Sequence, residues 1–345
     1  METRLLPSHD AGLQEAADLL RKGRLVAFPT ETVYGLGGLA SNPESIREIF
    51  SAKGRPSTDP LILHLLDPDL PKAVTEGWVA APLPASAIQL AKIFWPGPLT
   101  LILRRGPKVY PEMTAGLETV AVRCPAHPAA RKLLQLVGHP LAAPSANQFG
   151  RISPTDAEAV RQELGGKIPM ILDGGPSSVG LESTVVNLVG PAPEILRPGA
   201  ITPDQIAKVV QLAPILRHAT TTKEQAQIAP GQMHSHYAPR TPLYLCETPI
   251  EACSPGAFHV LFRKPPGSLF PHAVLVGSEG DSTSAARELY RVLRWADQSG
   301  AKAILVDPVP AGPWSEAICD RLTRASHGTA RWNGQSWELR LRPTA

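Results

Sequence analysis

The clearest indication of chemistry in the sequence is a pair of cations two residues apart. Lys53 and Arg55 lie in the run Lys53-Gly54-Arg55-Pro56, where glycine and proline define a tight loop. Two positive side chains on a rigid turn can hold a polyphosphate, and the guanidinium matches phosphate oxygens in pairs. A solvated helix end, where cations favour the C-terminal dipole, explains the same pattern equally well. The run is not the Walker A loop, which reads GxxxxGK[ST].

Arg123 and His64 are polar residues associated with apolar runs. Arg123 follows the run Thr119–Val122, and a cation in such a place is rarely left without a partner. Either the carboxylate of a ligand or an internal acid would satisfy it. His64 lies inside the run Leu61–Leu65, where a histidine is more often a satisfied core residue than a ligand.

The segment FPTETVYGLGG, residues 28–38, predicts a strand that passes into a turn of hydroxyl residues and glycines. Glycines let a ligand approach the backbone closely, and ligand sites on α/β sheets gather at strand ends. A purely structural turn is an equally good interpretation.

Small polar residues and further arginines follow several other apolar runs. These positions are Ser145, Asn147, Arg151, Ser183, Thr184 and Arg197. Together with Lys53, Arg55, Arg123 and the glycines of residues 28–38, they predict a site of hydroxyl groups, glycines and four or five cations. The sequence has no motif for a nucleophilic cysteine, a Ser-His-Asp arrangement or a metal cluster. Chemistry there would depend on positioning and charge stabilisation, as in phosphoryl and nucleotidyl transfer.

Alternating apolar runs and helical patterns must position these residues. Strands are predicted at Leu25–Phe28, Leu61–Leu65, Leu99–Leu103, Thr119–Val122, Leu141–Ala143, Met170–Leu172, Ser183–Leu188 and Glu194–Leu196. Helices are predicted at Gly12–Lys22, Pro43–Ala52, Ala85–Phe94, Pro128–Val137, Pro154–Leu164 and Pro203–Gln211. This mixture predicts an α/β domain with a twisted mixed sheet over residues 1–212.

Three of these helices carry the same start signal, a capping side chain before a proline. The pairs are Asn42-Pro43, Ser153-Pro154 and Thr202-Pro203. Thr202 and Gln205 also fit a capping box.

The chain beyond residue 212 divides into a linker and a second domain. Residues 213–240 are polar with little periodicity, which predicts a linker. Residues 241–345 resume strands at Leu243–Cys246, Phe258–Phe262, Ala273–Val276 and Ala303–Val306, with helices at Ser282–Gln298 and Trp314–Ala325. We expect a smaller, doubly wound Rossmann-like α/β domain there.

Length and composition agree with two globular domains. The chain has 345 residues, a net charge of +3 and no run of five like charges, so nothing predicts a nucleic-acid-binding arm. Its four cysteines form no CxxC pair and are expected to be free thiols. The sequence shows neither an apolar signal core nor a membrane-spanning run, so a soluble cytoplasmic protein is expected.

A distinctive set of motifs occurs in order along the chain. They are PTETVYGLG, the KxRP loop leading into PLILHL, WPGPLTLIL, TVAVRCPAHP, APSAN, DGGPSSVGLESTVV, ILRPGAIT and APGQMHSHYAP. This set resembles the Sua5/YrdC/YwlC family over nearly the whole length, in the longer Sua5 form with a C-terminal domain. The resemblance implies a YrdC-like domain with a concave active site.

The resemblance also implies an activity, that of L-threonylcarbamoyladenylate synthases, which are nucleotidyltransferases. These enzymes join L-threonine, bicarbonate or CO2, and ATP, with Mg2+, and release pyrophosphate. Their product feeds the N6-threonylcarbamoyl modification (t6A) of adenosine 37 in tRNA, through a downstream threonylcarbamoyl transferase complex. A weak contact with tRNA itself is compatible with that role.

Residue roles follow from the matching motif positions. Lys53, Arg55 and Arg123 would be the catalytic cations, and Arg123 would hold the threonine carboxylate. Thr32, His64, Ala143 and Ser183 would line the threonine pocket. ATP would meet Lys53, Arg55, Asp59, Thr119, Ser145, Arg151 and Arg197, with His236 and Tyr237 of the linker folding over it as a lid. The family often has asparagine where this chain has Asp59, and an acid there would repel phosphate unless Mg2+ intervened.

Two other functions compete with this interpretation. A basic α/β surface could bind double-stranded RNA or tRNA through phosphates, which would make binding fall steeply with salt. A carbamoyltransferase related to hydrogenase maturation shares the YrdC-like domain, but it would need zinc-finger modules, and this chain has no CxxC pair.

Overall fold

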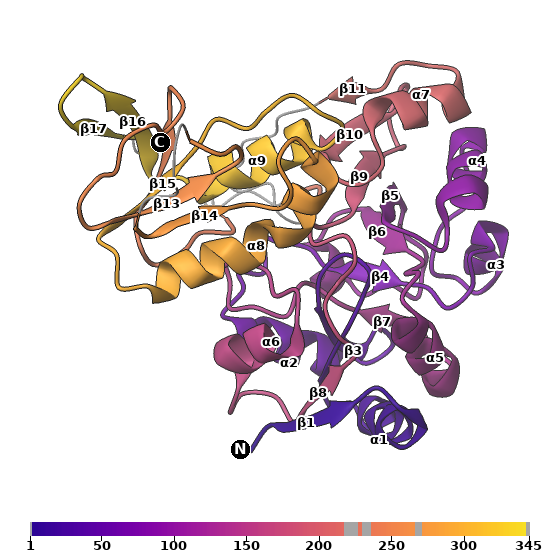
Figure 1. Cartoon of the computed structure of the whole chain (residues 1–345). Helices are drawn as coiled ribbons and strands as arrows, with labels where there is room; N and C mark the ends of the chain where they lie inside the picture. Colours follow the sequence, from indigo (N-terminus) through magenta and orange to yellow (C-terminus); the bar gives the residue numbers. More distant parts are fainter. Residues whose placement is uncertain (1, 217–226, 230–235, 266–270, 343–345) are drawn as a thin grey trace. The chain divides into compact units, whose positions relative to one another are not determined.

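A computed structural model describes residues 2–216, 227–229, 236–265 and 271–342 in two compact units (Figure 1). Of these residues, the first unit holds those up to Phe149 and from Ser153 to Ala229. The second unit holds Gly150–Ile152 and the residues from His236 onward. None of the helices in the described ranges is long and apolar enough to cross a lipid bilayer.

In the described part of the first unit, the strands form one mixed sheet in the order β1-β8-β2-β3-β7-β4-β6-β5-β9-β10-β11. Parallel and antiparallel neighbours both occur: β4 runs parallel to β6, and β5 runs antiparallel to β6. The strands are β1 Arg4–Pro7, β2 Val26–Phe28, β3 Gly35–Leu39, β4 Ile62–His64, β5 Leu99–Arg104, β6 Thr119–Arg123, β7 Leu141–Ala142, β8 Met170–Asp173, β9 Thr184–Asn187, β10 Glu194–Arg197 and β11 Ile215–Leu216.

Helices cover this sheet unevenly. They are α1 Asp10–Arg21, α2 Pro43–Lys53, α3 Leu70–Thr75, α4 Ala85–Phe94, the 3₁₀ helix Pro111–Thr114, α5 Pro128–Val137, α6 Ala157–Leu164 and α7 Pro203–Val210. Apolar residues of α2, α4, α6 and α7 join the large core on one face. Helices α1 and α5 pack on the other face, against strands at the β1 to β7 side of the sheet.

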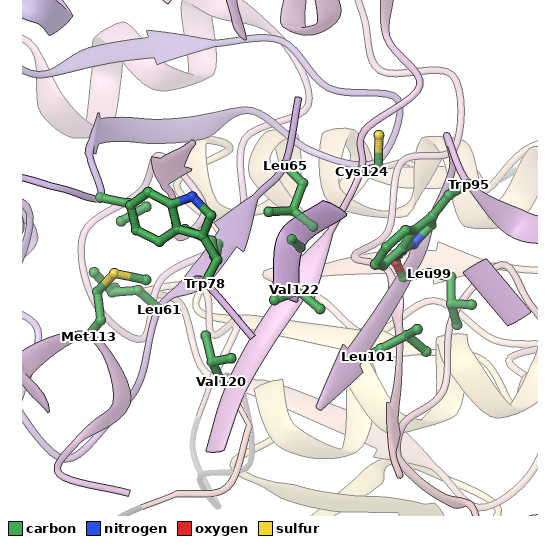
Figure 2. Close-up of a cluster of buried hydrophobic side chains, with 14 of the residues drawn as sticks. Leu61, Leu65, Trp78, Trp95, Leu99, Leu101, Met113, Val120, Val122 and Cys124 are labelled. Atoms are coloured by element: carbon green, nitrogen blue, oxygen red, sulfur yellow. Dashed lines mark hydrogen bonds between the residues drawn. The ribbon is translucent and has the colours of Figure 1, made fainter. Parts of the chain in front are cut away.

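The alternation of side chains along the central strands separates a core face from a site face. Leu61 and Leu65 beside β4, Val120 and Val122 of β6, and Leu101 of β5 point into the large core (Figure 2). The intervening residues therefore point to the opposite face. There a small apolar cluster is built from strand residues and one residue of the linker: Ile62, Ile102, Ala121, Val185, Leu196 and Ala229.

The strand β3 corrects the prediction that its glycines form a turn. Gly35–Leu39 pairs with β2 and is buried throughout. Glycine is required there by packing, because a Cβ on Gly37 would lie 2.7 Å from the ring of Phe28. Low β propensity hid this strand from sequence reasoning, since tertiary packing outweighs the preference of glycine for turns.

Two of the three predicted helix starts are confirmed. The Asn42 side chain accepts from the backbone of α2, and Thr202 with Gln205 forms the expected capping box of α7. The third start is wrong, because α6 begins at Ala157 and is capped by Asp156. Asp156 accepts a hydrogen bond from the backbone N–H of Ala159, a better cap than the upstream Ser-Pro pair supplies.

The second unit has the expected Rossmann-like character. In its described part the sheet order is β14-β13-β15-β12-β16-β17, parallel except for the last pair. The elements are β12 Leu243–Cys246, β13 Ala257–Leu261, β14 Ala273–Leu275, α8 Ser282–Gln298, β15 Ala303–Val306, α9 Ser315–Ala325, β16 Gly328–Trp332 and β17 Trp337–Leu341. The final hairpin, β16 and β17, was not predicted from the sequence.

Candidate functional site

The site face of the central strands carries two of the polar residues that the sequence singled out, His64 and Arg123. His64 ends β4 and Arg123 ends β6, and the two residues are direct neighbours in the parallel pairing of these strands. Both side chains are almost fully buried, at 3% and 4% exposed. Helices α1 and α5 cover the neighbouring part of this face, so the polar residues begin where the helical cover ends.

The guanidinium of Arg123 is held from three sides. Its Nε donates to the carbonyl oxygen of Gly97 (3.3 Å), and Nη1 donates to the Thr32 hydroxyl (2.9 Å). Nη2 donates to Oε1 of Glu31 at 2.6 Å, which forms a buried ion pair. The sequence left open whether a ligand or an internal acid would satisfy Arg123. The structure identifies an internal acid, Glu31.

Glu31 is itself fixed on both of its oxygens. While Oε1 accepts from Arg123, Oε2 accepts from the backbone N–H groups of Ala126 (3.0 Å) and His127 (3.3 Å), just before α5. Burial alone would raise the pKa of Glu31, but the Arg123 charge and these hydrogen bonds hold it below its usual value. Glu31 is therefore a carboxylate in the folded protein.

His64 is a neutral imidazole in this environment. Burial, and next the charge of Arg123, lowers the pKa of His64 to about 3. Its Nδ1 lies 3.2 Å from the carbonyl oxygen of Ile62, and a carbonyl can only accept, so the ring proton is on Nδ1. That leaves Nε2 as an acceptor. Phe28 packs edge-on against the ring, with 6.1 Å between centroids.

A second cluster joins Ser183, which directly precedes β9, to Arg197 at the end of the neighbouring strand β10. Arg197 donates from Nε to the Ser183 carbonyl and from Nη2 to the Ser183 hydroxyl, both at 3.1 Å. The Thr100 hydroxyl of β5 lies 2.7 Å from the same hydroxyl. All three residues are buried. Ser183, which is predicted to line the threonine pocket, therefore contacts Arg197, which is predicted to bind ATP.

Lys53, at the end of α2, reaches into the loop that follows β7. Its Nζ donates to the carbonyl oxygens of Ser145 and Asn147. The Ser145 hydroxyl in turn donates to the side chain of Asn147. Burial, and next the charge of Arg55, hold the pKa of Lys53 well below its usual value. A nearby anion strongly stabilises the charged form of such a lysine.

Arg55 and Asp59 form a buried pair beside this loop. Nη2 of Arg55 lies 2.8 Å from the Asp59 carboxylate and donates at 2.7 Å to the carbonyl of Pro60, while Nε donates to the carbonyl of Asp59. The carboxylate of Asp59 therefore neutralises Arg55 and fixes its plane. The linker reaches this place too, since the Gln227 N–H donates to the carbonyl of Thr58 at 2.9 Å.

Several of the predicted site residues lie at opposite ends of the parallel strands β4 and β6. Thr119 begins β6 and Arg123 ends it, and four residues of extended chain span about 13 Å. The Arg55–Asp59 pair precedes β4, which runs parallel to β6, so it lies toward the Thr119 end. Ala143 follows β7, beside β4, and its N–H donates to the Ile62 carbonyl. The separation along the strands is incomplete, because Ala143 meets Ile62 on the Thr119 side of His64, and Arg197 contacts Ser183.

Three predicted residues lie in the second unit. Arg151 pairs there with Asp297 of α8 at 3.1 Å. Tyr237 stacks with Tyr290 and lies under the Arg321 guanidinium, and the His236 N–H donates to the Arg324 carbonyl. Their predicted contacts with ATP stay predictions.

Sequence reasoning gave no role to Glu31 or Thr100, and it singled out Asn147 only as one of the small polar residues that follow apolar runs. Glu31 had a signal, because it is the acid in the PTET motif and a buried arginine needed a negative partner. Thr100 had none, since a threonine in a β strand is ordinary. Asn147 ends the APSAN motif, where either a turn or a ligand would favour asparagine.

Sequence profiles of two families match the chain. The Sua5/YciO/YrdC profile, described as "Telomere recombination", matches residues 18–199. The Sua5 C-terminal profile, described as "Threonylcarbamoyl-AMP synthase, C-terminal domain", matches residues 201–327.

Similar proteins cover almost the full length of the chain. A Bacillus subtilis protein named threonylcarbamoyl-AMP synthase is 40% identical over 336 residues, which are 94% of this chain and 95% of that protein. A Pyrococcus abyssi protein of the same name is 38% identical over 90% of this chain and 93% of that protein. The crystal structure of P. abyssi Sua5 complexed with L-threonine superimposes with a TM-score of 0.86 at 35% identity, covering 96% of this chain and 100% of that one. The expected resemblance is confirmed, and the chain belongs to the Sua5/YrdC family.

Proposed function

We propose that this protein is a threonylcarbamoyl-AMP synthase, which converts L-threonine, bicarbonate or CO2, and ATP into L-threonylcarbamoyladenylate and pyrophosphate. The observation that carries the proposal is the row of buried cations, Arg123 and Arg197, with neutral His64 on one sheet face. The threonine-bound Sua5 structure and the two synthases of similar sequence support the same conclusion.

Threonine would bind at the His64 and Arg123 end of the central strands. Each Nη of Arg123 has two N–H groups and uses one in the contacts described above, so one on each remains for the two carboxylate oxygens of an amino acid. Neutral His64 offers an acceptor at Nε2 for the amino or hydroxyl group. Thr32, Ala143 and Ser183 complete the proposed pocket.

The reaction would proceed by carbamate formation and then nucleotidyl transfer. The threonine amine attacks CO2, forms the N–C bond and loses a proton. An oxygen of the resulting carbamate attacks the α-phosphorus of ATP, and the bond to the β-phosphate oxygen breaks, so pyrophosphate leaves with that electron pair. On this basis the enzyme is a nucleotidyltransferase.

ATP would occupy the other end, beside Lys53 and Arg55. Its negative charge would stabilise the charged form of Lys53 and raise its pKa again, and Arg197 would bridge toward the threonine end through Ser183. Thr119, Ser145, Asp59 and Arg151 are proposed to contact the nucleotide. Mg2+ is proposed to arrive as part of the ATP complex, bound to its phosphate oxygens.

The linker is proposed to shield the reaction from water. Ala229 packs in the apolar cluster of the site face, and Gln227 is bonded to the loop beside Asp59. His236 and Tyr237 would complete this cover when substrates are bound. Exclusion of water would matter because a mixed acyl-phosphate anhydride is readily hydrolysed.

The product would pass to a threonylcarbamoyl transferase that modifies adenosine 37 of tRNA. We place the protein in the cytoplasm, because its four cysteines are all free thiols, as in a reducing compartment.

The proposal is tested by replacing the amino-acid clamp. Arg123→Ala should lower threonine-dependent pyrophosphate release by at least a hundredfold, about 3 kcal/mol of transition-state stabilisation. Arg161→Ala removes an exposed arginine that pairs with Glu158 and serves as the control. Release by Arg123→Ala at the wild-type rate would remove the clamp from the mechanism.

A further inference from the structure

We propose that Glu31 is a positioning residue for threonine recognition: it holds the Arg123 guanidinium in the orientation that receives the carboxylate of the amino acid. The inference rests on the proposed function, and it assigns a role to the acid of the PTET motif. The geometry points to Glu31 because both of its oxygens are used, one by the guanidinium and one by the backbone before α5.

Arg123 needs such a partner because a long side chain must be ordered before it can act as a clamp. An arginine loses rotamer entropy when it binds, and that loss weakens binding unless the side chain is already fixed. Gly97, Thr32 and Glu31 each fix a different nitrogen of the guanidinium. Of the three contacts only Glu31 carries charge, so it also offsets the cost of burying a cation.

The carboxylate of Glu31 is chemically necessary in this place, and its amide would not serve. Every group that meets its two oxygens is a donor: the Arg123 Nη2 on one side, and the N–H groups of Ala126 and His127 on the other. A carboxylate accepts on both oxygens, whereas a glutamine has one acceptor and one donor. Glu31→Gln would therefore set a donor against a donor on one side, in either orientation of the amide.

Two opposing effects of Glu31 on threonine affinity can be weighed. Its negative charge repels the incoming carboxylate, so its removal would tighten binding. Replacement by glutamine also frees the guanidinium from its clamp orientation and sets a donor against a donor. The second effect should dominate, because a bidentate clamp needs both Nη atoms of Arg123 to face the carboxylate in one plane, and a displaced guanidinium loses both hydrogen bonds.

The experiment compares wild-type protein with Glu31→Gln, with Glu158→Gln as the matched control. Glu158 also pairs with an arginine, Arg161, but both side chains are exposed. We expect Glu31→Gln to raise the KM for threonine about tenfold or more, while the KM for ATP stays within about twofold. The turnover at saturating threonine should fall much less than kcat/KM. Glu158→Gln should match wild type in all three quantities.

Several outcomes would overturn the inference. An unchanged or lower KM for threonine in Glu31→Gln would mean that Glu31 does not position Arg123. An equal rise in the KM for both substrates would indicate a general structural role. If Glu31→Gln does not fold, Glu31→Asp replaces it: its shorter side chain keeps both acceptors but cannot reach both groups of donors, so the threonine KM alone should still rise.

The route through Arg123 is tested by combining substitutions. In an Arg123→Ala background, Glu31→Gln should cause no further loss of threonine binding, because the group it positions is gone. Additive losses would contradict the inference. Direct binding of L-threonine, measured by calorimetry, separates this result from the proposed function. If the wild-type protein binds threonine but shows no turnover, the proposed reaction fails. The ratio of the threonine dissociation constants of wild type and Glu31→Gln still tests whether Glu31 positions Arg123.

Discussion

His64 gives the folded protein a dependence on pH that a replacement can remove. The unfolded chain binds a proton near the usual histidine pKa of about 6.5, whereas the folded chain does so only at about 3. Stability is therefore lost as pH falls from 6.5 toward 3. Between pH 7 and pH 5, His64→Gln should lose less unfolding free energy than wild type, by up to about 2 kcal/mol. Chemical denaturation at both pH values measures this, with exposed His139→Gln as the control.

Lys53 should take up a proton when ATP binds. Burial and Arg55 lower its pKa in the ligand-free protein, and the phosphates would raise it again. Calorimetric titrations over a series of pH values, each in two buffers with different protonation enthalpies, report the protons taken up. The uptake should disappear in Lys53→Arg, which keeps the charge but does not titrate in this range. Equal uptake by both proteins would contradict this role.

The residues of the site were largely visible in the sequence, but their partners were not. The cations followed apolar strands, so their types and places could be inferred. That Arg123 meets Glu31, residues 92 positions apart, depends on how β6 lies beside the loop after β2. Arg197 and Thr100 meet at Ser183 for the same reason, because β5 and β9 are parallel neighbours. Pairings of this kind arise from sheet order, which a single sequence does not encode locally.

At the scale of elements, the turn after β10 is positioned by a glycine. A Cβ on Gly199 would lie 2.5 Å from the backbone nitrogen of Thr184 and 2.8 Å from the Ser183 carbonyl carbon. Gly199→Ala should therefore push the Ser183 segment away from Arg197. We expect a loss of about 1–3 kcal/mol in stability and a higher KM for threonine. Thermal unfolding and steady-state kinetics measure the two effects.

Gly190, in the connection between β9 and β10, supplies the matched control. A Cβ there would meet nothing closer than 3.8 Å, and the residue is exposed. Gly190→Ala should leave stability and kinetics close to wild type. If both substitutions are equally mild, close packing at Gly199 does not position Ser183.

Elements with strong periodicity were predictable, and those defined by packing were not. The predicted helix Pro128–Val137 is α5 with the same bounds, because apolar spacing and the proline start agree. Strand β3 escaped prediction because its glycines are selected by contact with Phe28 rather than by strand propensity. Most residues of β17 in the edge hairpin of β16 and β17 are exposed. The sequence there therefore shows no alternation of apolar and polar residues that would predict the strand.

At the scale of the whole molecule, the chain length and the alternation of predicted strands and helices indicated two units. The prediction was least specific in the linker. Part of the segment expected to be a linker forms β11, which pairs with β10, and another part lies on the site face through Ala229. His234, part of the motif APGQMHSHYAP in the same segment, lies outside the described residues. A polar stretch without periodicity gives no local sign of such contacts.

The position of Ala229 yields a test in the full-length protein. Ala229→Asp would place a charge among Ile62, Ile102 and other apolar residues, so this part of the linker should leave the face. We expect synthesis to fall about tenfold or more while the unfolding temperature changes little. Ile228→Asp, at a neighbour that is 36% exposed, should stay near wild type. Full activity of Ala229→Asp would show that this linker contact is dispensable.

The central claim is that one sheet face brings threonine and ATP together for nucleotidyl transfer, and omission of single substrates tests it most directly. Purified protein is incubated with ATP labelled in the adenine moiety, and the nucleotides are separated by thin-layer chromatography. The account predicts that AMP, as threonylcarbamoyl-AMP and its hydrolysis product, appears with pyrophosphate only when both threonine and bicarbonate are present. Cleavage that ignores threonine would contradict it, as would salt-sensitive tRNA binding with no cleavage at all.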